Sequence, residues 1–202
     1  MLNPDLSRRL LELLEKDEAK RLELVERGEL WNRGYHPEME AVHRRNARVL
    51  EEILDGHAWP ARQQVGDEGA KAAWMVAVHA ISEPAFQRRC RELLGRAVAR
   101  GEASAAHLAN LVDRIRFNER RPQVYGTIFD WDSEGVLSPW PIEDPQGVTA
   151  RREAAGLPDL ESTIRRAREA AERQGEAPRH DFAQRQGEIL RWARRVGWTR
   201  AS

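Results

Sequence analysis

The run from Ala70 to Ile81, AKAAWMVAVHAI, constrains the fold more than any other stretch, because only Lys71 and His79 in it are not hydrophobic. A helix that is apolar on nearly all sides is normally buried at the centre of a domain. The run is too short to span a bilayer, and charged residues lie close on both sides. We therefore predict a central core helix over 70–81, with His79 near its end.

The length of 202 residues fits one domain, which we place at 1–202. The 33 basic and 33 acidic side chains balance, so no overall field favours nucleic acid or a membrane as a partner. The single cysteine, Cys90, fits a reducing compartment, and the N-terminus carries no apolar export segment. We expect a cytoplasmic protein that binds neither nucleic acid nor a membrane; its oligomeric state stays open.

Helical spacing of apolar residues, with prolines and capping residues at the starts, predicts further helices on both sides of the central one. The predicted ranges are about 4–28, 37–54, 84–101, a segment beginning after Ser104, a short segment around Arg151 and Arg152, and two peripheral C-terminal helices at about 158–174 and 179–196. Ser82 is expected to cap the helix that starts at Pro84. Asp17 and Arg21, four residues apart, are expected to form a surface ion pair.

The residue composition of the chain changes after Arg121. Residues 123–131 are rich in β-branched and aromatic side chains, and residues 132–135 have the composition of a turn. Pro139 and Pro141 restrict the second strand to a sheet edge. We predict a β-hairpin at about 123–141, with strands near 123–131 and 135–141. The fold class is therefore mainly α, a single-domain helical bundle with one small β-hairpin.

Several short motifs follow one another in a specific order. They are His57-Ala-Trp-Pro, Ala73-Trp74 with His79 five residues later, Phe86-Gln87, Asp113-Arg114, Gln123-x-Tyr125-Gly-Thr127, Pro141-Ile-x-Asp144 and Arg151-Arg152-x₃-Gly156-Leu157. In this order the chain resembles, over roughly residues 5–160, a bacterial family catalogued as domain of unknown function 6624. Asp17, Arg21 and Asn46 also match the N-terminal pattern of that family.

The chain departs from the family pattern at three positions. Ala58 replaces a usual glycine, and Val78 and Ile128 replace usual glutamines. The resemblance implies a shared site, but it brings no reaction with it.

The polar residues of these motifs adjoin apolar or turn segments, which is the mixture expected for acid/base chemistry on a buried ligand. His79 in an apolar cleft could serve as a general base, with Asp113 fixing its tautomer. Tyr125 and His57 complete the predicted catalytic set. For substrate binding we expect polar contacts from Gln123, Arg114 and Thr127 and apolar walls from Trp59 and Trp74. We predict that His79, Asp113, Gln123 and Tyr125 converge on one pocket.

The sequence also leaves alternatives open. No phosphate-binding glycine loop, dinucleotide fingerprint or nucleophile motif occurs, so no cofactor is expected. The scattered histidines lack metal-ligand spacing, so no metal ligands are assigned, although a metal-dependent enzyme using His57 and His79 is an alternative. Another is a non-catalytic ligand-binding or protein-partner module, in which the polar residues only tie the hairpin to the helices. His79 could also be a satisfied core histidine without a further role. The leading expectation is a cytoplasmic, biosynthetic type of enzyme acting on a small organic substrate without a cofactor.

Overall fold

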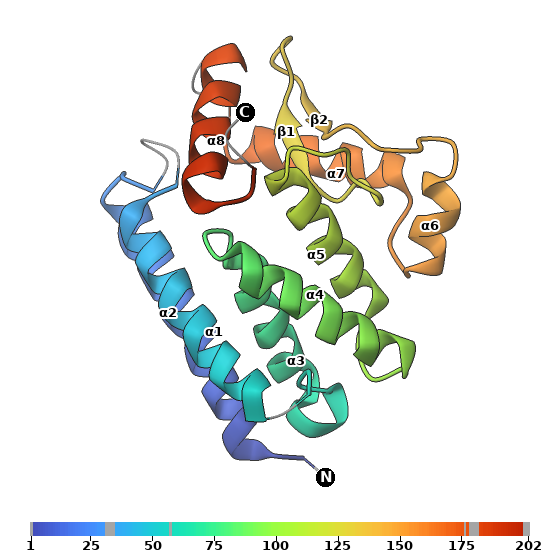
Figure 1. The fold of residues 1–202 in the computed structure, drawn as a ribbon. Coiled ribbons are helices and arrows are strands. Elements are labelled where there is room, and N and C mark those ends of the chain that lie inside the picture. The colour runs from blue at the N-terminus through green and yellow to red at the C-terminus, as the bar shows by residue number, and fades with distance from the viewer. Residues whose placement is uncertain (1, 31–34, 57, 176, 178–181, 200–202) are drawn as a thin grey trace. The chain divides into compact units, whose positions relative to one another are not determined.

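The computed structural model describes residues 2–30, 35–56, 58–175, 177 and 182–199. Within these residues it contains eight helices and one two-stranded antiparallel sheet (Figure 1). Their order is α1 (Pro4–Glu26), α2 (Pro37–Gly56), α3 (Arg62–His79), α4 (Pro84–Ala99), α5 (Ala105–Asn118), β1 (Phe129–Trp131), β2 (Leu137–Pro139), α6 (Val148–Ala154), α7 (Leu160–Arg173) and α8 (Phe182–Val196). The predicted mainly helical fold with one hairpin is confirmed. No helix in the described ranges is both long enough and apolar enough to cross a bilayer.

The chain divides into two units, Met1–Leu108 and Ala109–Ser202, where the sequence led us to expect one domain over 1–202. The division falls within α5.

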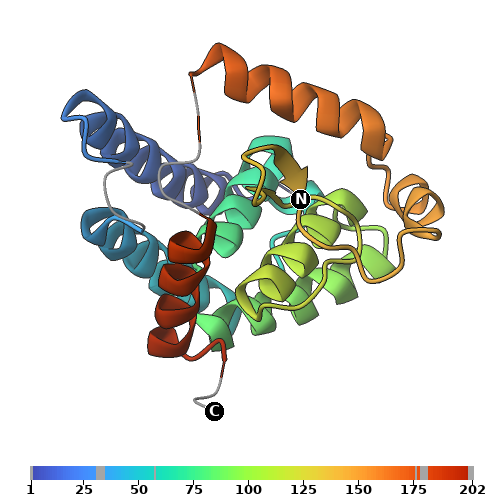
Figure 2. The ribbon, with the colours of Figure 1, turned by 90° about the horizontal axis from the view of Figure 1, so that it is seen from above.

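In the first unit, α3 packs against α1, α2 and α4. The helices α1 and α2 lie side by side and run in opposite directions (Figures 1 and 2). The start of α1 follows from its sequence, because the Asn3 side chain accepts a hydrogen bond from the Leu6 N–H at 3.1 Å and Pro4 occupies the first turn. Because α3 packs against three other helices, α1, α2 and α4, it is the central helix of this unit.

The central helix differs from the prediction at both ends. It begins at Arg62 instead of near residue 70, and it ends at His79 instead of at Ile81. Gly66 has a backbone φ of 72° and ψ of 178°, so the continuous helical stretch follows this glycine. Val76 and Ala77 are buried, whereas Lys71 is exposed. The apolar run therefore forms a core helix with one polar position facing solvent.

The start of α4 also differs from the prediction. Glu83, and not Ser82, occupies the N-cap position, and neither side chain makes the capping hydrogen bond. Ser82 is instead 5 % exposed and contributes to the buried side of the turn. Pro84 takes the first helical turn as expected.

In the second unit, β1 and β2 pair with Phe129 opposite Pro139 and Trp131 opposite Leu137. Each strand covers three residues, fewer than predicted, and an isolated parallel bridge joins Gln123 to Ile142. The helix α7 contacts both β2 and α6, and α6 lies at its N-terminal end (Figures 1 and 2).

Candidate functional site

Asp17 is a buried carboxylate in α1. The residue is 4 % exposed and lies on the same buried stripe as Leu10, Leu13 and Leu24. A carboxylate in such surroundings requires hydrogen-bond partners, because burial of an unpaired charge is strongly unfavourable. The partners come from two other helices of the first unit.

Two histidines contact this carboxylate, one at each oxygen. His79 Nδ1, at the end of α3, lies 2.6 Å from Asp17 Oδ2, and His43 Nε2, in α2, lies 3.2 Å from Asp17 Oδ1. The centroids of the two imidazole rings are 5.0 Å apart. The Tyr35 hydroxyl lies 2.5 Å from His43 Nδ1. We call Asp17, His43, His79 and Tyr35 the Asp17 cluster.

The chemistry of these groups fixes where the hydrogens lie. A carboxylate only accepts hydrogen bonds, so His43 Nε2 and His79 Nδ1 must each carry a hydrogen. In a neutral imidazole the other nitrogen is an acceptor; His43 Nδ1 then accepts from the Tyr35 hydroxyl, and His79 Nε2 presents a lone pair. No group in the described part of the chain hydrogen-bonds His79 Nε2, and the His79 side chain is 32 % exposed. Among the described residues, His79 Nε2 is therefore the imidazole nitrogen of the cluster that has no hydrogen-bond partner.

The same contacts determine the charge of the carboxylate. Burial by itself would raise the pKa of Asp17, but the hydrogen bonds and charges of His43 and His79 outweigh it, and the pKa lies well below its ordinary value. Burial raises the pKa of Tyr35, so its hydroxyl keeps its hydrogen. At neutral pH the cluster therefore contains one carboxylate anion and a neutral phenol.

Two buried amide side chains hold the helices that carry the cluster. Gln87 of α4 is fully buried, and its Nε2 donates to the carbonyl oxygens of Ala77 at 2.6 Å and Val78 at 2.9 Å. This contact holds the end of α3. Asn46 of α2 donates from Nδ2 to the Leu13 carbonyl at 2.8 Å and so ties α2 to α1. Both amides satisfy backbone groups and fix the geometry of the site.

Sequence reasoning did not identify Asp17 as a site residue. It predicted a surface ion pair with Arg21, and this prediction was wrong: Arg21 Nη2 contacts Glu18 Oε1 at 2.7 Å, while Asp17 is buried against the histidines. The available signal was the leucine stripe, because Asp17 falls seven residues after Leu10 on the buried face of α1.

His43 was also missed, because it was considered only as one of several scattered histidines. Its position gave a signal: it follows Met39 by four residues and precedes Asn46 by three, and both of these residues are buried in α2. A histidine at that spacing lies on the core side of a helix.

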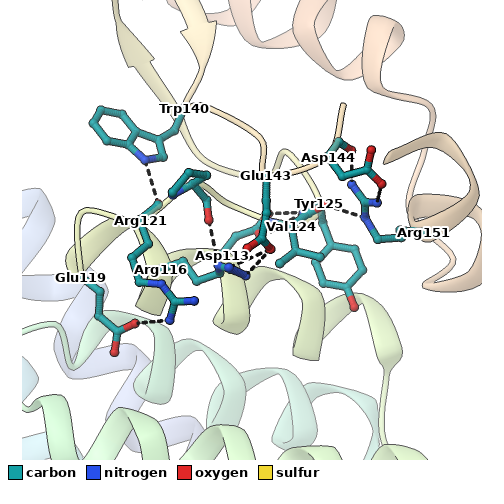
Figure 3. Close-up of polar contacts among 11 residues, drawn as sticks. Asp113, Arg116, Glu119, Arg121, Val124, Tyr125, Trp140, Glu143, Asp144 and Arg151 are labelled. Carbon is teal, nitrogen blue, oxygen red and sulfur yellow. Dashed lines mark hydrogen bonds and ion pairs between the residues drawn. The ribbon is translucent and has the colours of Figure 1, made fainter. Parts of the chain in front are cut away.

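Asp113, predicted as the residue that orients His79, has a different set of partners in the second unit (Figure 3). Its Oδ1 accepts from the N–H groups of Val124 at 2.7 Å and Tyr125 at 3.1 Å, and its Oδ2 accepts from the N–H and hydroxyl of Thr127 at 3.0 and 2.9 Å. The residue is fully buried. These bonds hold the 124–127 segment as a loop and explain why the first strand is shorter than predicted, since those N–H groups cannot also pair with a strand.

Gln123 completes the same loop. Its Nε2 donates to the carbonyl oxygens of Ile128 at 3.0 Å and Trp140 at 2.6 Å, and its Oε1 accepts from the Ile128 N–H at 2.9 Å. Gly126 has a φ of 70°, and a Cβ there would lie 2.9 Å from Leu160 Cδ1. The Gln-x-Tyr-Gly-Thr motif therefore encodes a specific loop backbone.

The loop backbone is thus held by the hydrogen bonds of Asp113, Gln123 and Thr127. The carboxylate that orients His79 in the first unit is Asp17. The predicted catalytic and substrate-binding roles of the second-unit residues, and their convergence with His79 on one pocket, stay predictions.

The other predicted site residues are distributed between the two units. Trp59 is 2 % exposed in the first unit, and Trp74 stacks on His107 with centroids 4.3 Å apart and donates from Nε1 to the His107 carbonyl at 3.0 Å. In the second unit, burial lowers the pKa of Arg114, whose Nε has no hydrogen-bond partner among the described residues.

Two predicted catalytic residues remain. The hydroxyl of Tyr125 makes no hydrogen bond to any group that the structure describes, and Figure 3 draws it outside the network around Asp113. His57 lies outside the described residues.

Comparison with known proteins gives one positive result. No curated protein and no solved structure matches the chain. The model of a family of unknown function, DUF6624, matches residues 4–174, a range that includes the Asp17 cluster and the loop fixed by Asp113. The chain therefore belongs to the DUF6624 family.

Proposed function

We propose that this protein is a cytoplasmic enzyme that acts on a small organic substrate by acid/base chemistry, with His79 as the general base. The observation that carries the proposal is the 2.6 Å contact between His79 Nδ1 and Asp17 Oδ2, with Nε2 unpartnered among described groups on the other side of the ring. A carboxylate in this position holds the imidazole in the tautomer whose Nε2 can accept a proton. Asp17 is then a positioning residue.

The proposed step requires no cofactor. His79 Nε2 takes a proton from a C–H or O–H group of the substrate, and the electron pair of that bond stays on the substrate. The ring becomes an imidazolium, which the neighbouring Asp17 anion stabilises. The proton then returns to another atom of the substrate or to water. His43 contacts the second carboxylate oxygen, and Tyr35 holds the His43 ring through its Nδ1, so the two residues restrain rotation of the Asp17 carboxylate.

The test begins with a thermal-shift screen of metabolites on the wild-type protein, followed by NMR detection of product for each compound that stabilises it. His79→Gln should lower kcat by about 10²–10⁴-fold, the usual contribution of a general base. Asp17→Asn should lower kcat while leaving KM nearly unchanged, because it disturbs the tautomer and leaves the substrate contacts in place. The matched control is His36→Gln, a partly buried histidine of the same unit that lies outside the cluster.

Two results would contradict the proposal. Turnover that survives in His79→Gln would exclude this histidine as the base. A compound that binds the wild type without ever forming product would favour the alternative of a non-catalytic binding module.

A further inference from the structure

The ligand atoms of the Asp17 cluster have the spacing of a metal site. The carboxylate of Asp17, one nitrogen of His43 and one nitrogen of His79 all lie within 4.8 Å of one another. Zn²⁺ binds nitrogen and oxygen ligands at about 2.0–2.2 Å, which places neighbouring tetrahedral ligands about 3.4 Å apart. The two carboxylate-to-imidazole separations of 2.6 and 3.2 Å differ from that value by less than about an ångström, and the two imidazole nitrogens lie within 4.8 Å of each other. Side-chain shifts on the order of an ångström would therefore complete the geometry.

The surroundings of these three residues suit a metal ion. Metal-bound histidines usually direct their second ring nitrogen to an oxygen, and the Tyr35 hydroxyl occupies that position against His43. Within the described residues, the hydrogen bonds and ion pairs of the Asp17 carboxylate come from histidines alone, so no Lys or Arg pairs directly with it. Because the three ligands come from three packed helices of one unit, the site is formed by the fold itself.

A second group of similar composition, Glu29, His36 and Glu38, is less suitable. Arg27 pairs with both of its carboxylates, and Lys20 lies 3.0 Å from Glu38 Oε2. His36 Nδ1 accepts a hydrogen bond from the Glu38 N–H at 3.2 Å. The charges and lone pairs that would bind an ion are already engaged there.

We propose that Asp17, His43 and His79 bind one divalent transition metal ion of the Zn²⁺ type, and that the bound ion blocks the base. Two imidazoles and one carboxylate favour Zn²⁺, Co²⁺ or Fe²⁺, whereas Ca²⁺ and Mg²⁺ prefer sites made of oxygen ligands. The regulatory part rests on the proposed function. A metal on His79 Nδ1 moves the ring hydrogen to Nε2, which can then no longer accept a proton from a substrate.

The binding test uses the full chain after treatment with a chelator. Isothermal titration with ZnCl₂ should give one ion per chain, and His43→Ala and Asp17→Ala should each weaken binding at least 100-fold. Tyr35→Phe should weaken it by about 10–100-fold, as expected for a residue that supports a ligand. His36→Ala is the control and should leave binding unchanged. Circular dichroism checks that each variant keeps its helices.

A variant that gains a spectroscopic signal tests the metal site even if the variants that lose zinc binding fold poorly. His79→Cys loaded with Co²⁺ should show a thiolate-to-cobalt charge-transfer band that the wild type lacks, because Cys90 is buried and is the one native cysteine. Absence of zinc binding by the wild type, or its loss in His36→Ala instead of His43→Ala, would overturn the proposed site.

Different results would contradict the proposed acid/base function and the proposed metal site. Zinc binding without any substrate would leave the metal site standing and remove the acid/base function. A substrate whose turnover is insensitive to bound zinc would overturn the blocking role, and turnover without zinc binding would overturn the site.

Discussion

Two buried aspartates illustrate how the surroundings of a residue decide its role. Asp17 contacts two imidazoles, and an imidazole can both donate and accept a proton, so the groups around Asp17 are suited to proton transfer. Asp113 contacts the backbone N–H groups and the hydroxyl of one loop, none of which changes its protonation state near neutral pH. The residue type is the same, but its partners make Asp17 a candidate positioning residue for a base, whereas the partners of Asp113 are the groups of a loop whose backbone it holds.

The structural role of Asp113 gives a residue-scale prediction. Asp113→Ala removes the acceptor for several N–H groups that are then left without a partner, at about 1–3 kcal/mol each in the usual case. We expect a loss of at least about 3 kcal/mol in the free energy of unfolding, measured by urea denaturation. The control is Asp159→Ala, which removes the exposed N-cap of α7 and should cost about 1 kcal/mol. Equal effects of the two substitutions would contradict the assignment.

At the scale of elements, α3 shows how one glycine divides a helix. The residues before Gly66 form one turn, and the apolar run that follows forms the core helix ending at His79. With a φ of 72° and a ψ of 178°, Gly66 has a backbone conformation that essentially only glycine adopts, and it costs a residue with a Cβ about 1–3 kcal/mol. This glycine sets where the continuous helix begins and therefore the register of the residues that follow it.

The prediction at this scale compares two glycines of the first unit. Gly66→Ala should lower the free energy of unfolding by about 1–3 kcal/mol, because alanine disfavours this combination of φ and ψ. Gly95→Ala, inside α4, should raise it by up to about 1 kcal/mol, since alanine favours the helix and its Cβ would meet Leu108 at an ordinary 4.0 Å. Chemical denaturation of both variants checks the opposite signs. A stabilising Gly66→Ala would show that the break in α3 is not required.

At the scale of the whole molecule, the balance of charges is the dominant property. The formal net charge is zero at pH 7, with a sequence isoelectric point near 7.0. A protein without net charge has little electrostatic repulsion between copies, which favours association and precipitation. The same balance gives no general attraction to polyanions.

We therefore expect the solubility of the protein to be lowest near pH 7 and to rise toward pH 9, measured by precipitation with polyethylene glycol at constant ionic strength. Arg45→Glu combined with Arg48→Glu changes two exposed positions and makes the net charge more negative. The solubility minimum should then move to lower pH. A minimum that stays in place would indicate that local contacts, and not net charge, control solubility.

The sequence by itself determined the local structure. Apolar spacing, prolines and caps placed the helices to within a few residues at most ends, because these signals act over neighbouring turns of one segment. Composition placed the hairpin, and the ordered motifs identified the family and singled out His79. The length of the first strand was wrong because Asp113 binds the backbone groups that would otherwise extend it.

Only the tertiary structure decided which residues meet. His79 contacts Asp17 across 62 positions of sequence, and His43 contacts Asp17 across 26. No helical period relates positions on different helices; their contact depends on how α1, α2 and α3 pack. Sequence reasoning therefore singled out His79 but did not find its contact with Asp17. A periodic pattern shows that a residue faces the core and leaves open which residue it faces there.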